Sequence, residues 1–166
     1  MISFLIGPAR SGKSTYCKEW LLNMPKRVVV NADQIRLELT GHRYFVPAEP
    51  VVHSIKLMMV RVLHSQGYHV LVDGTHTTEQ SVMDLLYIDP EANPIWIPSR
   101  EMYITDPYNI EAVCHQRARA TGQEDLFPVI TRMVKQAATL AENFPEKLEA
   151  MRVKSVKYNP NRSAVK

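Results

Sequence analysis

The sequence predicts an α/β fold in which a parallel β-sheet carries helices on both faces. Two observations lead to this prediction. Short apolar runs rich in β-branched residues have the character of buried parallel strands, and they occur at residues 2–6, 27–31 and 68–73. A segment of helical character follows each run, at residues 13–22, 32–39 and 78–87. Strands that alternate with helices in this way are typical of a parallel sheet.

The chain has the size and composition of one globular domain. It has 166 residues, of which 45% are apolar and 22% charged, with a net charge of +3. We therefore expect a single domain over residues 1–166. No apolar run is long enough for a membrane span, and the first one lacks the basic residues of an export signal, so we expect a cytoplasmic protein without membrane contact. Cys17 and Cys114 lack metal-site spacing and are expected to be reduced and buried.

A glycine-rich loop directly follows the first predicted strand. It fits the phosphate-binding pattern G-x-x-x-x-G-K-[ST], with the sequence Gly7-Pro8-Ala9-Arg10-Ser11-Gly12-Lys13-Ser14-Thr15. Glycines let successive backbone N–H groups turn toward phosphate oxygens, and the next helix points its positive end at the same oxygens. Lys13 can reach the terminal phosphates, while the Ser14 hydroxyl is a Mg²⁺ ligand. The loop therefore predicts a P-loop NTPase-type sheet that binds ATP or another nucleoside triphosphate with Mg²⁺.

The second half of the chain is predicted to be mostly helical. We expect a long amphipathic helix at 49–66 and two more helices, beginning at Asp106–Pro107 and at Pro128. We also expect a fourth strand at residues 101–104 and a last strand at residues 153–157. The segment of residues 89–99 is expected to be irregular, with at most a short extended piece around Trp96. Two functional segments are also interpreted, a small helical lid at about 109–127 and a basic C-terminal tail at about 152–166.

Polar residues follow the predicted strands. Asp33 and Arg36 come after the second strand, Asp73 ends the third, and Asp106 follows the expected fourth. Because parallel sheets bind ligands at the carboxyl ends of their strands, we expect these residues to lie near the glycine-rich loop. Asp73 is predicted to lie beside Mg²⁺ together with Ser14. The alternative for Asp73 is a helix-capping role.

Asp33 and Arg36 are candidates for the acceptor side of a transfer reaction. They are three residues apart on a predicted helix and therefore share one face. A carboxylate beside a phosphate site can accept the proton of an attacking hydroxyl, and an arginine can hold a substrate phosphate with its fork. The alternative is an ion pair within the helix.

Arg117 and Arg119 precede the polar segment at residues 121–125 and could close over the phosphates. Phosphoryl transfer needs positive charge, which mobile segments often supply. A solvated basic helix end is the alternative.

The basic C-terminal tail is a candidate for nucleic-acid contact, although charged tails are usually only solvated.

Three motifs together resemble the P-loop kinase domain of phage-type 5′-hydroxyl polynucleotide kinases and of small AAA-type, zeta-toxin-like kinases. They are the glycine-rich loop, Asn31-Ala32-Asp33-Gln34-Ile35-Arg36 and Val72-Asp73-Gly74-Thr75-His76-Thr77. The resemblance covers residues 1 to about 150. It implies that Asp33 is the general base for the 5′-hydroxyl and that Arg36 binds a phosphate of the acceptor nucleotide. It also implies that Lys13 and Ser14 act on ATP·Mg²⁺ and that Asp73 lies near the metal.

The chain departs from the family pattern at two positions. His76 stands where the family's third motif has asparagine, and Thr121 stands where the lid helix has its second arginine. Cys114 and Arg117 match the lid pattern, and Arg119 could substitute from another face of the helix. The sequence thus leaves open which lid arginine contacts the phosphates.

The function predicted from these residues is ATP-dependent transfer of a phosphate to a hydroxyl, with the 5′-hydroxyl end of DNA or RNA as first choice. A small-molecule hydroxyl, on a nucleoside, nucleotide or nucleotide-sugar, is the alternative within the same chemistry, and a modified DNA base is a third possibility. A nucleotide-dependent switch or ATPase is the alternative from another class. Asp33 and Arg36 argue against a switch, because a switch needs no acceptor site.

Overall fold

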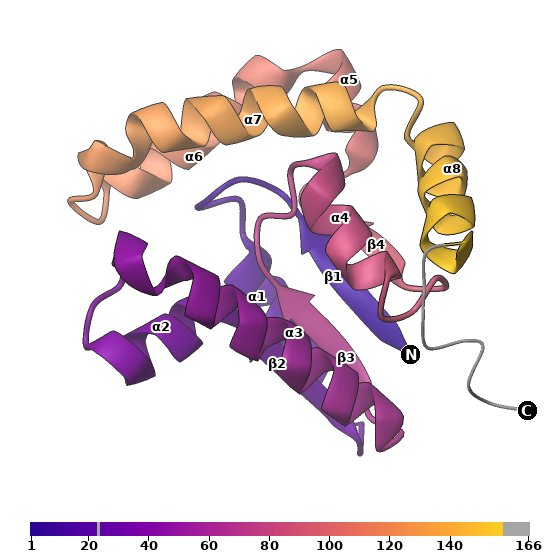
Figure 1. Cartoon of the computed structure of the whole chain (residues 1–166). Helices are drawn as coiled ribbons and strands as arrows, with labels where there is room; N and C mark the ends of the chain where they lie inside the picture. The colour runs from indigo at the N-terminus through magenta and orange to yellow at the C-terminus, as the bar shows by residue number, and fades with distance from the viewer. Residues whose placement is uncertain (23, 158–166) are drawn as a thin grey trace, which may run out of the picture.

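The computed structural model describes residues 1–22 and 24–157 and shows strands alternating with helices through the first two thirds of the chain (Figure 1). The first half contains β1 Ile2–Ile6, α1 Lys13–Leu21, β2 Arg27–Asn31, α2 Ala32–Thr40, α3 Glu49–Ser65 and β3 His69–Asp73. The second half contains α4 Glu79–Leu86, β4 Asn93–Trp96, α5 Arg100–Thr105, α6 Pro107–Arg119, α7 Phe127–Ala141 and α8 Phe144–Lys157. Short 3₁₀ turns, η1 Val46–Ala48 and η2 Glu124–Leu126, precede α3 and α7.

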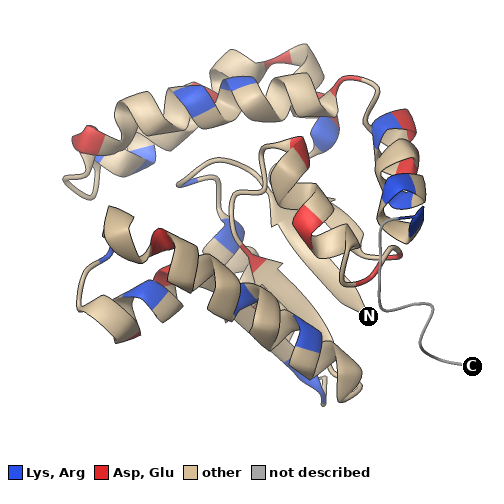
Figure 2. Ribbon diagram, in the orientation of Figure 1, with Lys and Arg blue, Asp and Glu red and all other residues tan. Residues whose placement is uncertain are grey.

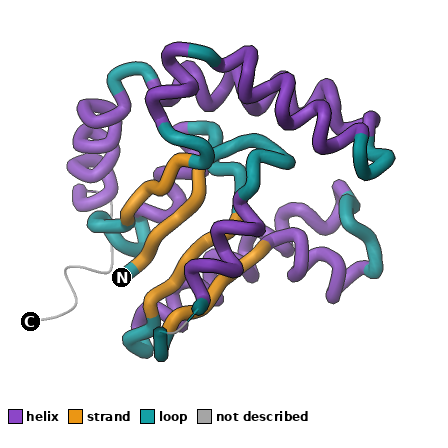
Figure 3. The backbone as a smooth tube through the Cα atoms, turned by 180° about the vertical axis from the view of Figure 1, so that it is seen from behind, coloured by secondary structure: helices purple, strands orange, loops and turns teal. Residues whose placement is uncertain are grey.

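Within the described residues, four parallel strands form one sheet in the order β2-β3-β1-β4. The register aligns the carboxyl ends of the strands, because Asn31 pairs with Asp73 and Ile6 pairs with Trp96. The strands run side by side in the view from behind (Figure 3). Whatever follows each strand is therefore delivered to one edge of the sheet, and β3 lies between the strand that precedes the glycine-rich loop and the strand that precedes α2.

Helices cover both faces of the sheet, as the sequence predicts. On one face, α3, α4 and α8 pack against alternate strand residues such as Phe4, Val30 and Val72 to form the main core. On the other face, α1 packs through Cys17 and Trp20 against Leu5 and Leu71. The alternation of the two sets along β1 and β3 is the period-two pattern of strands covered on both sides.

The helices α5, α6 and α7 form a separate layer at the carboxyl edge of the sheet (Figure 1). Their shared core contains Tyr103, Ile110, Cys114, Ile130 and Val134. The helix α7 is strongly amphipathic. Its buried apolar residues repeat at helical spacing and form one stripe, made of Ile130, Val134, Ala137 and Ala141. We call α6, η2 and α7 together the helical hairpin. The segment expected to form a lid, residues 109–127, lies within it.

Two predicted strands are wrong. Residues 101–104 lie in α5, and residues 153–157 lie at the end of α8. The fourth strand is instead β4, around Trp96, where only a short extended piece was expected. Asp106 therefore follows a helix rather than a strand, and its side chain caps α6 by accepting from the Asn109 N–H at 3.2 Å. Short apolar runs fit both element types, and in these two cases tertiary packing selects the helix.

The described part of the predicted basic tail, residues 152–157, forms the last turns of α8, where Arg152, Lys154 and Lys157 are basic and Ser155 is buried (Figure 2). The acidic residues of this helix, Glu146 and Glu149, lie before the tail. The remainder of the predicted tail, with Arg162 and Lys166, lies outside the described residues. Cys17 and Cys114 are buried and unpaired, as expected. None of the helices in residues 1–22 and 24–157 has the length and hydrophobicity to cross a membrane.

Candidate functional site

The glycine-rich loop is held tightly between β1 and the start of α1. A side chain at Gly7 would place its Cβ 2.3 Å from the Ile97 carbonyl oxygen and 3.1 Å from the Tyr103 hydroxyl, so only glycine fits there. Gly12 has a φ of 110° directly before α1, a conformation that glycine adopts without strain. Gly7 N–H also donates to the Thr75 carbonyl at 3.0 Å, which ties the loop to the end of β3. The loop thus has the backbone shape that its motif predicts.

Lys13 lies buried under this loop. Its ammonium donates to the carbonyl oxygens of Gly7 at 3.1 Å and Pro8 at 2.5 Å. Burial lowers the pKa of Lys13, and the carboxylates of Asp73 and Asp33 oppose this lowering. Both carboxylates are therefore within electrostatic reach of the Lys13 ammonium. The structure brings the three predicted residues to the same edge of the sheet.

Asp73 ends β3 as a buried carboxylate with polar partners on both sides. The Asn31 side-chain amide donates to Asp73 Oδ2 at 2.6 Å from the neighbouring strand. The Cys17 thiol donates to Asp73 from α1, and burial together with this carboxylate raises the pKa of Cys17 to about 12. Burial also raises the pKa of Asp73, with Lys13 and Asn31 acting in the opposite direction. A carboxylate held in this way is better stabilised when a further cation lies beside it.

The residues predicted to hold Mg²⁺ suit that ion in their chemistry. Ser14 is exposed in the first turn of α1, and Asp73 offers a carboxylate whose raised pKa shows that burial is only partly offset by the cations around it. Among the described residues, no group of three or more His, Cys, Asp or Glu side chains could enclose a metal. Mg²⁺ commonly binds one or two protein oxygens and completes its shell with phosphates and water. The residues therefore fit an ion that arrives with a nucleotide.

Asp33 and Arg36 lie on α2, immediately after β2. Asn31 caps this helix by accepting from the Gln34 N–H at 3.0 Å, so one residue fixes both α2 and Asp73. The Asp33 side chain is 84% exposed and accepts from Arg36 Nη1 at 2.7 Å. This is the intrahelical ion pair that the sequence offered as an alternative. An exposed carboxylate at the edge remains accessible to an incoming hydroxyl.

Arg36 has its other nitrogens occupied by Glu49 at the start of α3. Nε and Nη2 donate to the two carboxylate oxygens of Glu49 at 2.5 and 2.9 Å, and Nη1 also donates to the Arg43 carbonyl. The hydrogen bonds from Arg36 to Glu49 raise the pKa of the guanidinium. The fork predicted to hold an acceptor phosphate is thus closed by a carboxylate in this conformation. An acceptor must displace Glu49 to bind Arg36 with two hydrogen bonds.

The helical hairpin rests on the glycine-rich loop through two contacts. Arg117 Nη1 donates to the Arg10 carbonyl at 3.1 Å, and the Arg10 guanidinium donates to the Gln123 side chain in the hairpin turn. Arg119 lies elsewhere: its Nε is 3.5 Å from Glu124, and its guanidinium lies over the Phe127 ring. Of the two arginines that the sequence left open, Arg117 is the one beside the loop.

Comparison with known proteins gives the family. A family model described as an AAA domain matches residues 2–136, which span the sheet, the glycine-rich loop and most of the hairpin. The chain belongs to this family. The P-loop kinase-like resemblance predicted from the motifs is confirmed at this level. No curated protein matches the sequence.

Two solved structures share the fold of this AAA domain. A chain of the Pnkp1/Rnl/Hen1 RNA repair complex superposes with a TM-score of 0.69 at 20% identity, over 86% of this chain and 45% of that chain. A second Pnkp1/Rnl/Hen1 complex gives 0.53 at 24% identity, over 58% of this chain and 34% of that chain. The AAA domain therefore spans less than half the length of the solved chains that it matches.

Three further residues shape this site of the AAA domain, and the motifs assign a role to none of them. Asn31 and Glu49 fix Asp73 and Arg36, and only the position of Asn31 at a strand end could have indicated a role. His76 is fully buried: its Nδ1 lies 2.8 Å from the Leu5 carbonyl, and Nε2 has no partner. Burial lowers the pKa of His76 to about 3, so the ring is a neutral structural group between β1 and β3.

Proposed function

We propose that this AAA domain is an ATP-dependent kinase that transfers the γ-phosphate to the 5′-hydroxyl of DNA or RNA. The observation that carries the proposal is the placement of an accessible carboxylate, Asp33, at the same sheet edge as Lys13 and Asp73. A nucleotide switch needs the loop and the buried aspartate but has no use for a second, exposed carboxylate at the same edge of the sheet.

The donor half of the reaction is assigned to the loop and the residues around it. The loop amides of residues 7–15 and Lys13 bind the β- and γ-phosphates, for which Lys13 exchanges its contacts with the Gly7 and Pro8 carbonyls. Ser14 and Asp73 would hold Mg²⁺. When bound, that ion neutralises charge on the transferring phosphates.

The acceptor half is assigned to α2. Asp33 accepts the proton of the attacking hydroxyl while the hydroxyl oxygen bonds to the γ-phosphorus. The bond between the γ-phosphorus and the β,γ-bridging oxygen breaks at the same time, which releases ADP. Arg36 orients the acceptor once an anionic group of the substrate replaces Glu49. The exposure of Asp33 supports this role, because a base must reach the hydroxyl from solvent.

We further propose that residues 109–127, within the helical hairpin, form the lid of a single kinase domain over residues 1–166. Arg117 stabilises the transferring phosphate, and its hydrogen bond to the Arg10 carbonyl already places it above the loop. Arg119 is held by Glu124 and Phe127 on another face and is the weaker candidate of the two.

The choice of a nucleic-acid acceptor has separate support. The Asp33 and Arg36 motif resembles that of 5′-hydroxyl polynucleotide kinases, and the structural neighbour with a TM-score of 0.69 is a chain of an RNA repair complex. A net charge of +3 is compatible with a polyanionic substrate. We place the reaction in the cytosol, where two buried, unpaired cysteines remain reduced.

The test is incubation with γ-labelled ATP and Mg²⁺ together with two matched oligonucleotides, one with a free 5′-hydroxyl and one already 5′-phosphorylated. We expect label only on the first. Label on both would redirect the proposal to an internal or base hydroxyl. Label on neither, when ATP binding is demonstrated on the same preparation, would contradict it. A panel of nucleosides and nucleotide-sugars under the same conditions would then identify a small-molecule acceptor.

A further inference from the structure

Several cations around the proposed site are already engaged. Lys13 binds loop carbonyls, Arg10 binds Gln123, and Arg36 is held by Asp33 and Glu49. Arg119 is paired with Glu124. A nucleic-acid acceptor brings a phosphate for each nucleotide beyond the first, and these engaged side chains offer it no unpaired cation.

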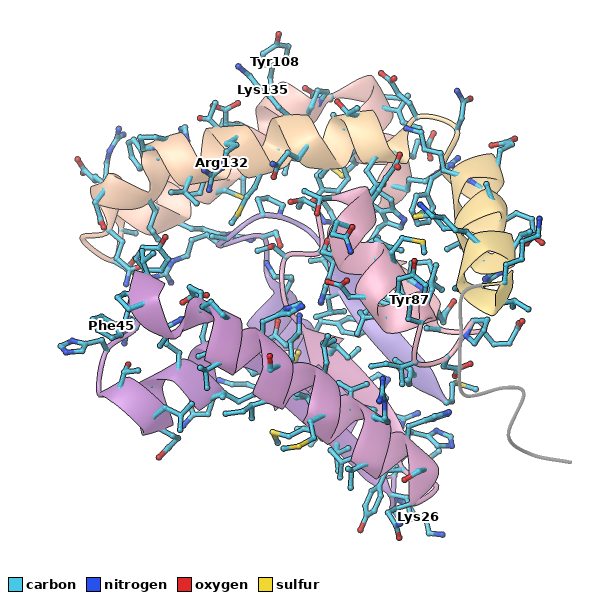
Figure 4. All side chains as sticks on the ribbon, viewed as in Figure 1. Lys26, Phe45, Tyr87, Tyr108, Arg132 and Lys135 are labelled. Carbon is cyan, nitrogen blue, oxygen red and sulfur yellow. The ribbon has the colours of Figure 1, made fainter. Side chains whose placement is uncertain are left out.

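Arg132 on α7 is a cation without a partner. It is exposed, and within residues 1–22 and 24–157 its side chain has no hydrogen bond, ion pair or ring contact. Figure 4 shows it leaving α7 on the side that faces the rest of the molecule. One free cation therefore lies on the inner side of the hairpin.

A hydrogen bond fixes the direction of this inner face. Gln136 Oε1 accepts from Thr77 Oγ1 at 3.0 Å, and Thr77 is buried four residues after the end of β3. Arg132 precedes Gln136 by four residues, so the two side chains lie about 40° apart on the helix. Arg132 is thus placed above the carboxyl end of β3.

The strand order makes this position significant. β3 lies between β1, which leads into the phosphate loop, and β2, which leads into Asp33. Arg132 is also one turn nearer than Gln136 to the hairpin turn, and in Figures 1 and 3 that turn lies on the α2 side of the sheet. Arg132 therefore lies on the α2 side of Gln136, toward the proposed acceptor residues.

We propose that Arg132 binds a backbone phosphate of the acceptor strand and so positions its 5′ end over Asp33. The inference rests on the proposed function and assigns its substrate contact to a residue that none of the motifs contains. It gives the strand a phosphate contact that does not require Arg36 to leave Glu49 first. Arg132 acts here as a positioning residue, since the proton and the phosphate move on other groups.

The experiment measures binding separately from transfer. A fluorescent single-stranded oligonucleotide with a 5′-hydroxyl is titrated into the protein with Mg²⁺ and a non-hydrolysable ATP analogue at several salt concentrations. For Arg132→Ala we expect about tenfold weaker binding and a salt slope that is smaller by about 0.7, the value for one lost phosphate contact on a single strand. Arg132→Lys should restore most of the slope, because it keeps the charge. In turnover, KM for the oligonucleotide should rise while kcat stays within about twofold.

Lys26→Ala is the control, because it removes one exposed charge directly before β2, at the end of the sheet opposite the proposed site. We expect its affinity and salt slope to match those of the wild type. The inference is overturned if Arg132→Ala matches the wild type, if Lys26→Ala loses as much as Arg132→Ala, or if the wild type binds no oligonucleotide. If the wild type binds and Arg132→Ala lowers the slope, but no 5′-hydroxyl becomes labelled, the strand contact stands and the proposed kinase function fails.

Discussion

The proposed donor and acceptor halves of the site differ in how completely they are formed. On the donor side, the loop is packed against Ile97 and Tyr103, and Lys13 is buried beneath it. On the acceptor side, Asp33 is 84% exposed and Arg36 is closed off by Glu49. A backbone-built phosphate site is complete before its ligand arrives, whereas a site built from long charged side chains takes substitute partners until the substrate displaces them.

The two halves meet at β3. Asp73 faces both of them, since Cys17 holds it from the donor side and Asn31 holds it from the acceptor side. Asn31 also caps α2, which carries Asp33. Asp33, Lys13 and Glu49 each lie on one side of this shared network, so measuring nucleotide binding and transfer independently distinguishes changes to the two halves.

Loss of the base should have the largest effect. Asp33→Asn removes the proton acceptor, and we expect transfer to fall by about 10²–10⁴-fold, because general-base catalysis contributes about that much. ATP affinity should be unchanged, since Asp33 lies on the acceptor side. The rates come from label transfer and the affinity from calorimetry. Glu38→Gln on the same helix is the control, and an Asp33→Asn variant with near-normal transfer would end the assignment.

Loss of the loop lysine should affect both binding and turnover. For Lys13→Ala we expect kcat/KM to fall by about 10²–10³-fold, the range for removing one strong donor to the transition state. Stability should not fall in parallel, because Lys13 is a buried cation whose pKa burial has lowered. Thermal unfolding distinguishes the two effects. A variant that unfolds early and transfers slowly would show that Lys13 is mainly structural.

The rigidity of the donor half is tested by Gly7→Ala. The new Cβ would lie 2.3 Å from the Ile97 carbonyl oxygen, and we expect a loss of about 1–3 kcal/mol in the free energy of unfolding. Gly41→Ala, at a φ of 70° with open space around it, should cost about 1 kcal/mol through backbone strain alone. Equal losses in urea unfolding would mean that the loop can relax and is less tightly packed than described.

The buried ring beneath β3 predicts a pH dependence of stability. Burial lowers the pKa of His76 from 6.5 to about 3 in the folded chain, so between these pH values the unfolded chain binds a proton that the folded chain excludes. The contribution of the neutral His76 ring to the free energy of unfolding is therefore complete above pH 6.5. This contribution falls as the pH drops toward 3, by up to about 1.4 kcal/mol per pH unit.

Urea unfolding at several pH values compares the wild type with His76→Asn, whose side chain does not titrate. The variant should lose part of the slope between pH 6.5 and 3, even if it is less stable overall. Replacement of the exposed His69 by Asn should leave the wild-type slope in place. Parallel curves for the wild type and His76→Asn would contradict the burial of this ring.

The smallest effect is expected at the acceptor pair. Glu49→Gln removes the charge that competes for Arg36, and its partly exposed ion pair is worth about 0–1 kcal/mol. We expect KM for a 5′-hydroxyl oligonucleotide to fall by about two- to fivefold, with ATP affinity unchanged. Steady-state kinetics at saturating ATP measures it. A higher KM would show that Glu49 holds Arg36 in its productive position instead of blocking it.

The same contrast explains how much of the molecule the sequence could predict. The glycine-rich loop, the strands β1, β2 and β3, and the helix α2 follow from local patterns, and the structure confirms them. The strands predicted at residues 101–104 and 153–157 are wrong because short apolar runs carry no period that separates strand from helix. The Glu49 contact joins residues 13 positions apart, and the position of Arg132 depends on how α7 docks. Such contacts exist only after folding.

The most direct measurement is a crystal structure with Mg²⁺, a non-hydrolysable ATP analogue and an oligonucleotide that carries a free 5′-hydroxyl. The account predicts the triphosphate on the loop of residues 7–15 and the 5′-oxygen within about 3.2 Å of an Asp33 carboxylate oxygen, in line with the γ-phosphate. A triphosphate on the loop with the 5′-oxygen bound to another residue, away from Asp33, would contradict it.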